Sequence, residues 1–391
     1  MSSSSKRVRE SHHETADIAT LDAREVITFQ FDSSPQLCHP EFVHQNFGEH
    51  GKILWPKELL PLSIKVHVNT YDNLRCKVLI EHGGSDLSEL ASASRQKLLN
   101  LISRPCDLGG GCKPALYPGD ISGQYSSVPE PLEVEPSIAE ELSGGFVVHR
   151  YQSKLFQNRV FQTWRRAEWL MLWFIESVSQ SEHESDPNWE YVLLRNKDNS
   201  IVALCSLYRF PSFSFLDKGF IGDRMRLSQF LTIPSGWNAG YGSSLLKALA
   251  QTILSRNDVD KFTMEDPSFG MTSVRESVYL KLSHELGLLG KDPSIEDLEE
   301  TLKIPRIFAK HLKNLIEISK LLQKLAPGND PVGELLQTNS EYVQRFLDSI
   351  EFYDDNEDDS NETGVMTSTK TETLIRERLG EAVLKLKRII A

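Results

Sequence analysis

The stretch that most constrains the fold is LTIPSGWNAGYGSSLLKALA, residues 231–250. It begins with an apolar segment, passes through a turn that contains Gly240 and Gly242, and continues with apolar residues at helical spacing. A short glycine-containing turn between a strand and a helix brings backbone N–H groups and the positive end of the helix dipole together. The stretch therefore predicts an α/β domain with an anion-binding turn.

Three classes of anionic ligand bind at turns of this kind. The Gly-Lys-Ser/Thr ending of a P-loop is absent from this one. A dinucleotide-binding fingerprint does not fit either, because Leu245 stands where its third glycine belongs and no strand–helix–strand unit precedes the turn. A pyrophosphate cradle of the acetyl-coenzyme A type remains, beside the alternative that the turn binds nothing.

The rest of the chain predicts a multidomain α/β (α+β) protein, because a chain of 391 residues is longer than a domain with a single hydrophobic core usually is. Alternating residues indicate strands over 26–31 and 63–69, and a Pro- and Gly-rich stretch over 104–145 marks a boundary. The predicted parts are a disordered N-terminal tail (1–24), an N-terminal mixed α/β domain (25–143), a central α/β domain (144–290) and a helical C-terminal region (291–391) with an acidic disordered linker (353–370).

Charge and composition exclude several functions. The net charge of −12 argues against direct binding to nucleic acid, which needs a basic face, and suits a basic partner, although it also serves solubility. No run approaches the ~20 apolar residues of a membrane-spanning helix, and the N-terminus lacks the apolar core of a signal peptide. The five cysteines form no CxxC pair and the histidines no HExxH, so we expect no metal site and an intracellular chain.

Further segments give the glycine turn a family context. They are RLSQFLTIPSGWNAGYGSSLL (226–246), MEDPS (264–268), LWFIES (172–177), HQNFG (44–48) and GGFVVHRYQSKLFQNRVFQTW (144–164). In these segments the chain resembles the GNAT acetyltransferases and, within them, the catalytic subunit of the type B histone acetyltransferases, over roughly residues 25–290. The resemblance implies a GNAT fold with its catalytic domain over 144–290.

The resemblance also implies acetyl-coenzyme A as co-substrate. In the family, the strand over 227–233 splays from its neighbour and pairs with the pantetheine arm, while amides of the turn hold the pyrophosphate. Trp237 departs from the Gln or Arg that begins the family's turn pattern, and Ala239 stands where relatives often carry Lys. The implied cofactor-binding residues are Phe230, Leu231, Thr232, Trp237, Asn238, Ala239, Gly240, Tyr241, Gly242, Ser243 and Ser268.

Three carboxylates are candidates for the proton transfer that such a reaction needs. A free lysine titrates near ~10.4, so a base has to take a proton before the amine attacks. Glu265 and Asp266 end a predicted strand before Pro267, which on its own is explained more simply as a surface strand end, and Glu176 follows a nearly unbroken apolar helix. The resemblance implies that Glu265 is the general base, with Glu176 and Asp266 beside it and acetyl transfer direct.

The activity implied is histone lysine N-acetylation on the tail of free, newly synthesised core histones, chiefly the smallest core histone. The resemblance further implies a WD40-repeat histone chaperone as partner and a location in nucleus and cytoplasm. Two alternatives stay open: a GNAT enzyme that acetylates another protein amine, such as an N-terminus, and a catalytically weak histone-binding scaffold. Intact Gly240, Gly242 and Glu265 favour an enzyme over the scaffold.

Overall fold

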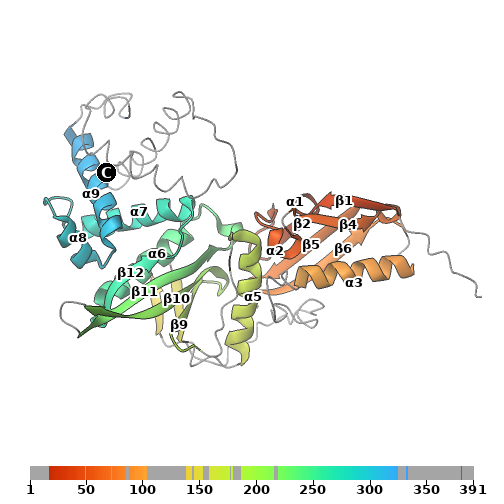
Figure 1. Cartoon of the computed structure of the whole chain (residues 1–391), viewed down its shortest axis with the longest axis horizontal. Coiled ribbons are helices and arrows are strands. Elements are labelled where there is room, and N and C mark those ends of the chain that lie inside the picture. Colours follow the sequence, from red (N-terminus) through yellow and green to blue (C-terminus); the bar gives the residue numbers. More distant parts are fainter. Residues whose placement is uncertain are drawn as a thin grey trace, which may run out of the picture.

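The computed structural model shows an α/β protein, as the sequence predicts, with two main sheets and covering helices (Figure 1). The described residues are 17–48, 50–71, 73–84, 88–103, 138–142, 145–152, 158–176, 178, 186–214 and 219–324, with the single residues 332 and 380. The predicted acidic linker over 353–370 lies outside the described residues, and so does almost all of the chain after residue 324.

The N-terminal part contains a four-stranded sheet of order β3-β2-β5-β6 and a two-stranded ribbon of β1 and β4. In β2 and β5 every second residue is buried, as their alternating sequence predicts. The elements are β1 (Ile18–Asp22), α1 (Ala23–Val26), β2 (Ile27–Phe31), β3 (Leu37–Cys38), α2 (His44–Phe47), β4 (Lys52–Pro56), the 3-10 turn η1 (Lys57–Leu59), β5 (Leu62–Asn69), β6 (Arg75–His82) and α3 (Glu89–Ser103).

The predicted disordered tail over 1–24 is wrong for its last residues. Strand β1 pairs antiparallel with β4, and Asp22 at its end accepts a hydrogen bond from the backbone N–H of Arg24, which caps α1. The side chain of Asp22 also pairs with Lys52 at 3.1 Å. This strand escaped prediction because its paired residues on β4 lie 30 to 38 positions further along the chain, from Asp22 with Lys52 to Ile18 with Pro56.

The central part is a six-stranded sheet of order β12-β11-β10-β9-β8-β7. Neighbouring strands are antiparallel except for β11 and β12, which are parallel because α6 crosses over between them. The edge strand β7 comes from residues that the prediction places before the boundary at 143/144. The elements are β7 (Ile138–Leu142), β8 (Phe146–Gln152), α5 (Asn158–Phe174), β9 (Trp189–Arg195), β10 (Ile201–Ser214), β11 (Gly219–Thr232), the 3-10 turn η3 (Pro234–Gly236), α6 (Tyr241–Ser255), β12 (Val259–Met264) and α7 (Phe269–Glu285).

Two further helices, α8 (Ile295–Leu302) and α9 (Arg306–Lys324), lie beside α7 (Figure 1). Helix α9 contacts α7 through a buried cation–π pair and a buried polar pair. The guanidinium of Arg275 stacks 3.6 Å from the ring centroid of Phe308, and Nε2 of His311 lies 2.7 Å from a carboxylate oxygen of Glu276. The first helices of the C-terminal region are therefore part of the folded body.

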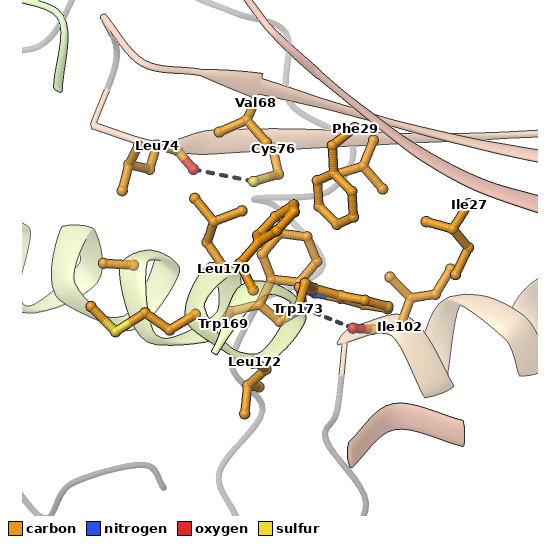
Figure 2. Packing of buried hydrophobic residues seen from close by; sticks show 14 of the residues in the cluster. Ile27, Phe29, Val68, Leu74, Cys76, Ile102, Trp169, Leu170, Leu172 and Trp173 are labelled. Carbon is orange, nitrogen blue, oxygen red and sulfur yellow. Dashed lines mark hydrogen bonds between the residues drawn. The ribbon is translucent and has the colours of Figure 1, made fainter. Parts of the chain in front are cut away.

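Helix α5 lies between the two sheets and joins their cores (Figure 1). The indole N–H of Trp169 donates a 2.8 Å hydrogen bond to the carbonyl of Ile102 at the end of α3 (Figure 2). The ring of Trp173 packs against that of Phe29 of β2, with 5.5 Å between the ring centroids (Figure 2). The same buried cluster continues into Leu231 of β11. One hydrophobic core therefore runs from the N-terminal sheet to the strand that precedes the glycine turn.

Candidate functional site

Strands β11 and β12 separate at a defined point. Strand β11 pairs with β10 as far as Thr232, but its pairing with β12 ends at Leu227 opposite Met264. There the backbone N–H of Glu265 donates to the carbonyl of Leu227 at 2.9 Å. In the part of the chain that the structure describes, residues 228–232 therefore pair with a strand on one side only, and their other side is an open edge.

A β-bulge sets which backbone groups face this open edge. Ser206 lies opposite Gln229 and Leu207 opposite Leu227, so Ser228 is the extra residue. After the bulge, Ile233 donates to the carbonyl of Val202 in β10 at 3.0 Å. Antiparallel strands alternate between residues that point their backbone groups at the partner and residues that point them away.

This alternation divides the three residues predicted to pair with a pantetheine arm. Ile233 points its backbone groups at β10, so Leu231 does too, while Thr232 and Phe230 point theirs to the open edge. The side chain of Leu231 is buried in the core. The open edge therefore presents the N–H and C=O groups of two residues, Phe230 and Thr232.

The glycine turn has the backbone that an anion cradle needs. Asn238 and Gly240 adopt the left-handed region, with φ of 64° and 83°. Helix α6 begins directly afterwards, so the N–H groups of its first turn, at Tyr241, Gly242 and Ser243, have no acceptor within the helix. Their positive field suits a phosphate or pyrophosphate.

Close packing behind the turn favours glycine at position 242. A Cβ atom there would lie 3.0 Å from Oγ1 of Thr232 and 3.5 Å from the ring of Phe230. Gly242 of the turn thus packs against the side chains of Thr232 and Phe230 on β11. The residues present fit a ligand that joins a pyrophosphate to an extended amide-bearing arm, which is the chemistry of coenzyme A.

Trp237 makes a contact that the sequence did not indicate. Its indole N–H donates to the carbonyl of Thr232 at 2.9 Å, and its ring stands edge-on to Phe174 at 6.1 Å between centroids. The residue remains 43% exposed. The indole therefore lies against the open edge.

The adjacent carboxylates follow β12 at the point where the strands separate. Glu265 and Asp266 are both exposed, and Asp266 has a φ of 31°, so the strand ends before Pro267 as the sequence suggests. Oε2 of Glu265 lies 3.2 Å from Nε of Arg226 on β11. The guanidinium of Arg226 also stacks on Phe210 at 4.8 Å. Two neighbouring strands therefore hold the carboxylate of Glu265 in place.

Glu176 lies on another element, in a segment that the N-terminal part holds on both sides. Before it, the backbone N–H groups of Glu41 and Phe42 donate to the carbonyl of Trp173 at 2.9 and 3.0 Å. After it, the buried side chain of Gln45 donates to the carbonyl of Val178 at 2.9 Å. Within the described ranges, Glu176 is exposed and no hydrogen bond or ion pair joins it to the other two candidate carboxylates.

Ser268 has a structural role in this structure. Its hydroxyl accepts a hydrogen bond from the backbone N–H of Met271 at 3.3 Å and so caps α7. It lies three residues after Glu265, at a second helix N-terminus beside the site. A contact of Ser268 with a cofactor stays a prediction.

A row of half-buried aromatic side chains leads to the carboxylate and was not predicted. The ring centroids of Trp189 and Tyr208 lie 4.8 Å apart, and those of Tyr208 and Phe210 lie 4.5 Å apart. Tyr208 lies opposite Arg226 in the sheet. The hydrogen bond from the Tyr208 hydroxyl to Asp186, 2.7 Å long, raises the pKa of Tyr208. Alternate aromatic residues in the strand sequences were the available signal, but only the sheet brings them into one row.

The described residues also bear on metal and cysteine chemistry. None of its His, Cys, Asp and Glu side chains form a group of three or more that could hold a metal ion. Cys205 is fully buried, and burial raises the pKa of its thiol, which disfavours the nucleophilic thiolate. None of the described helices has the length and apolar character needed to cross a membrane.

Comparison with known proteins supports the resemblance to type B histone acetyltransferases, although no protein-family model matches the chain. Over 169 residues the chain is 26% identical to the histone acetyltransferase type B catalytic subunit of Rattus norvegicus, covering 40% of this chain and 39% of that protein. Over 140 residues it is 31% identical to that of Cryptococcus neoformans, covering 34% and 32%. The match thus spans well under two thirds of these relatives.

Solved structures give only a weak likeness. One match is the acetyltransferase domain of xEco2 bound to a K105-CoA conjugate. The aligned region covers 36% of this chain and 90% of the xEco2 chain at 8% identity, with a TM-score of 0.27. A TM-score this low adds nothing to the sheet order and strand geometry described above.

Proposed function

We propose that this protein is an acetyl-coenzyme A-dependent lysine N-acetyltransferase of the type B histone kind. The observation that carries the proposal is the separation of β11 from β12 beside the glycine turn, with Glu265 at the point of separation. The turn amides lie at one end of the open edge and Glu265 at the other. This is the order in which a coenzyme A thioester presents its pyrophosphate, its amide-bearing arm and its reactive end.

The backbone supplies most of the cofactor site in this proposal. Acetyl-coenzyme A, when bound, supplies the acetyl thioester. The open-edge groups of Phe230 and Thr232 would pair with its arm, and the N–H groups of Tyr241, Gly242 and Ser243 would hold its pyrophosphate. The N–H of Ala239 already donates to the carbonyl of Gly236. Because backbone groups do this work, the departures at Trp237 and Ala239 leave the cradle intact.

Glu265 is proposed as the base that removes a proton from the lysine. Its Oε2 faces Arg226, so we assign Oε1 to the amine proton. The side chain of Glu265 is 39% exposed, which lets the proton pass on to solvent. Asp266 and Glu176 are proposed as auxiliary carboxylates that attract the lysine ammonium.

The proposed substrate is the tail of free, newly synthesised core histones, chiefly the smallest. The aromatic row of Trp189, Tyr208 and Phe210 offers half-exposed ring faces, and one of them already stacks with the guanidinium of Arg226. Such faces suit lysine and arginine side chains of a tail, as does a chain of net charge −12. A WD40-repeat histone chaperone as partner, and a location in nucleus and cytoplasm, are proposed with the substrate.

The test is acetyl transfer from labelled acetyl-coenzyme A to free core histones, with nucleosomes and a tail peptide carrying arginine at every lysine as controls. Label on lysines of the free histones alone supports the proposal. Label on the N-terminal amine of the arginine peptide would instead indicate an enzyme for another protein amine.

Histone binding with no transfer, and with no rise of the Tm by acetyl-coenzyme A, would indicate a scaffold. A ligand that binds only the native state raises its apparent stability, so a missing rise means missing cofactor binding.

A further inference from the structure

We infer that Trp237 competes with the cofactor: its indole occupies the backbone acceptor of Thr232 that the pantetheine arm would use. This inference rests on the proposed function and concerns the affinity of the same site. It makes Trp237 the residue that sets how tightly the arm is held, because the arm has to displace the indole before it pairs with β11.

The carbonyl of Thr232 points to the open edge of β11. Ile233 donates to Val202 in β10, so the preceding residue directs its carbonyl away from β10 and to the open edge. The pairing of β11 with β12 has already ended at Leu227. Within the described residues, the indole N–H of Trp237 donates to this carbonyl at 2.9 Å.

The donor to the Thr232 carbonyl belongs to a side chain and not to the backbone of a neighbouring strand. A carbonyl oxygen can accept two hydrogen bonds, but the indole ring that donates the first lies on the side from which an extended arm would pair. An arm that donates an amide N–H to this carbonyl replaces one N–H donor, the indole, with another. The indole is thus an internal substitute for the ligand's own amide.

The indole of Trp237 can leave without disturbing the turn. The backbone N–H of Trp237 donates to the carbonyl of Pro234 at 3.2 Å, and the backbone N–H of Ala239 donates to the carbonyl of Gly236 at 3.1 Å. These bonds hold the turn independently of the side chain. Within the described residues, the indole is held by its hydrogen bond to Thr232 and by its T-shaped contact with Phe174, and 43% of the surface of Trp237 is exposed.

Trp237→Phe isolates the competing hydrogen bond, because phenylalanine keeps a ring beside Phe174 and cannot donate. The variant should bind coenzyme A about 2- to 10-fold more tightly, the factor that one net hydrogen bond represents. The nucleotide part of coenzyme A, 3′-phospho-ADP, retains the pyrophosphate and lacks the arm. Its affinity should be the same for the wild type and the variant.

The experiment is calorimetric titration of the full chain and of Trp237→Phe with both probes, together with tryptophan emission. We expect coenzyme A to shift the wild-type emission to the red as the indole leaves for water, and the shift to vanish in the variant. Equal or weaker binding of coenzyme A by the variant, or an equal gain for 3′-phospho-ADP, would overturn the inference and leave the proposed function standing. A wild type that binds neither probe would overturn both.

Discussion

Nε of Arg226 lies 3.2 Å from Oε2 of Glu265, so the proposed base is held by the strand from which its own strand separates. Arg226 is itself fixed by its stacking on Phe210. We expect Arg226→Gln to lower kcat about 10- to 100-fold, the scale of a misplaced catalytic group, while the Kd for coenzyme A stays constant. Arg224→Gln, at an exposed residue two positions earlier on β11, is the control. Equal rates for the two variants would contradict a positioning role.

Alanine substitution at the two glycines of the turn should affect different quantities, the affinity for coenzyme A at Gly242 and the stability of the fold at Gly240. Gly242→Ala places a Cβ 3.0 Å from Thr232 Oγ1, inside the close approach of turn and strand, so we expect the Kd for coenzyme A to rise about 10-fold. Gly240→Ala meets open space but has a φ of 83°, which costs an L-residue about 1–2 kcal/mol of stability. Calorimetry and denaturant unfolding separate the two effects. Unchanged affinity in Gly242→Ala would contradict the proposed cradle.

Gln45 should matter for the segment that carries Glu176. Gln45→Leu keeps most of the side-chain volume and leaves the Val178 carbonyl without its 2.9 Å donor, which should cost about 1–3 kcal/mol of unfolding free energy. Gln36→Leu, at an exposed position of the same part of the chain, should cost much less. Urea unfolding of both variants measures the difference, and equal stabilities would show that the Gln45 contact does not hold this segment.

His149 gives a pH dependence with a definite sign. Burial, and then the charge of Arg195, lower the pKa of His149 in the folded protein below the usual value of about 6.5. Below about pH 6.5 the unfolded chain therefore binds a proton that the folded chain does not, so stability falls as the pH drops from there towards the folded pKa. The fall in Tm between pH 7 and pH 5 should be smaller in His149→Gln. The same fall in both proteins would contradict this assignment.

The local parts of the fold follow from the sequence. The strand, turn and helix of residues 231–250 are specified by neighbouring residues, as is the break before Pro267, and the structure has them in that order. Features that depend on a distant partner do not follow. The bulge at Ser228 exists only relative to β10, and the ribbon strand β1 needs β4. The domain boundary predicted at 143/144 is misplaced for the same reason, because β7, which precedes it, pairs with β8, which follows it.

The candidate site divides in the same way. Glycines, carboxylates and their order along the chain are visible in the sequence. Which backbone groups of β11 face the open edge, and which side chains approach Glu265, depend on strand register. The Trp237 indole could be placed within the turn from the sequence, but its bond to Thr232 requires the turn to fold back on the strand.

The most direct test of the central claim is single-turnover acetyl transfer to free core histones by Glu265→Gln, with Asp266→Asn beside it and the Kd for coenzyme A measured for both. A general base contributes about 10²- to 10⁴-fold, so Glu265→Gln should lose that much rate with an unchanged Kd, while Asp266→Asn loses far less. A Glu265→Gln variant that transfers acetyl as fast as the wild type would contradict the account and move the base to Asp266 or Glu176.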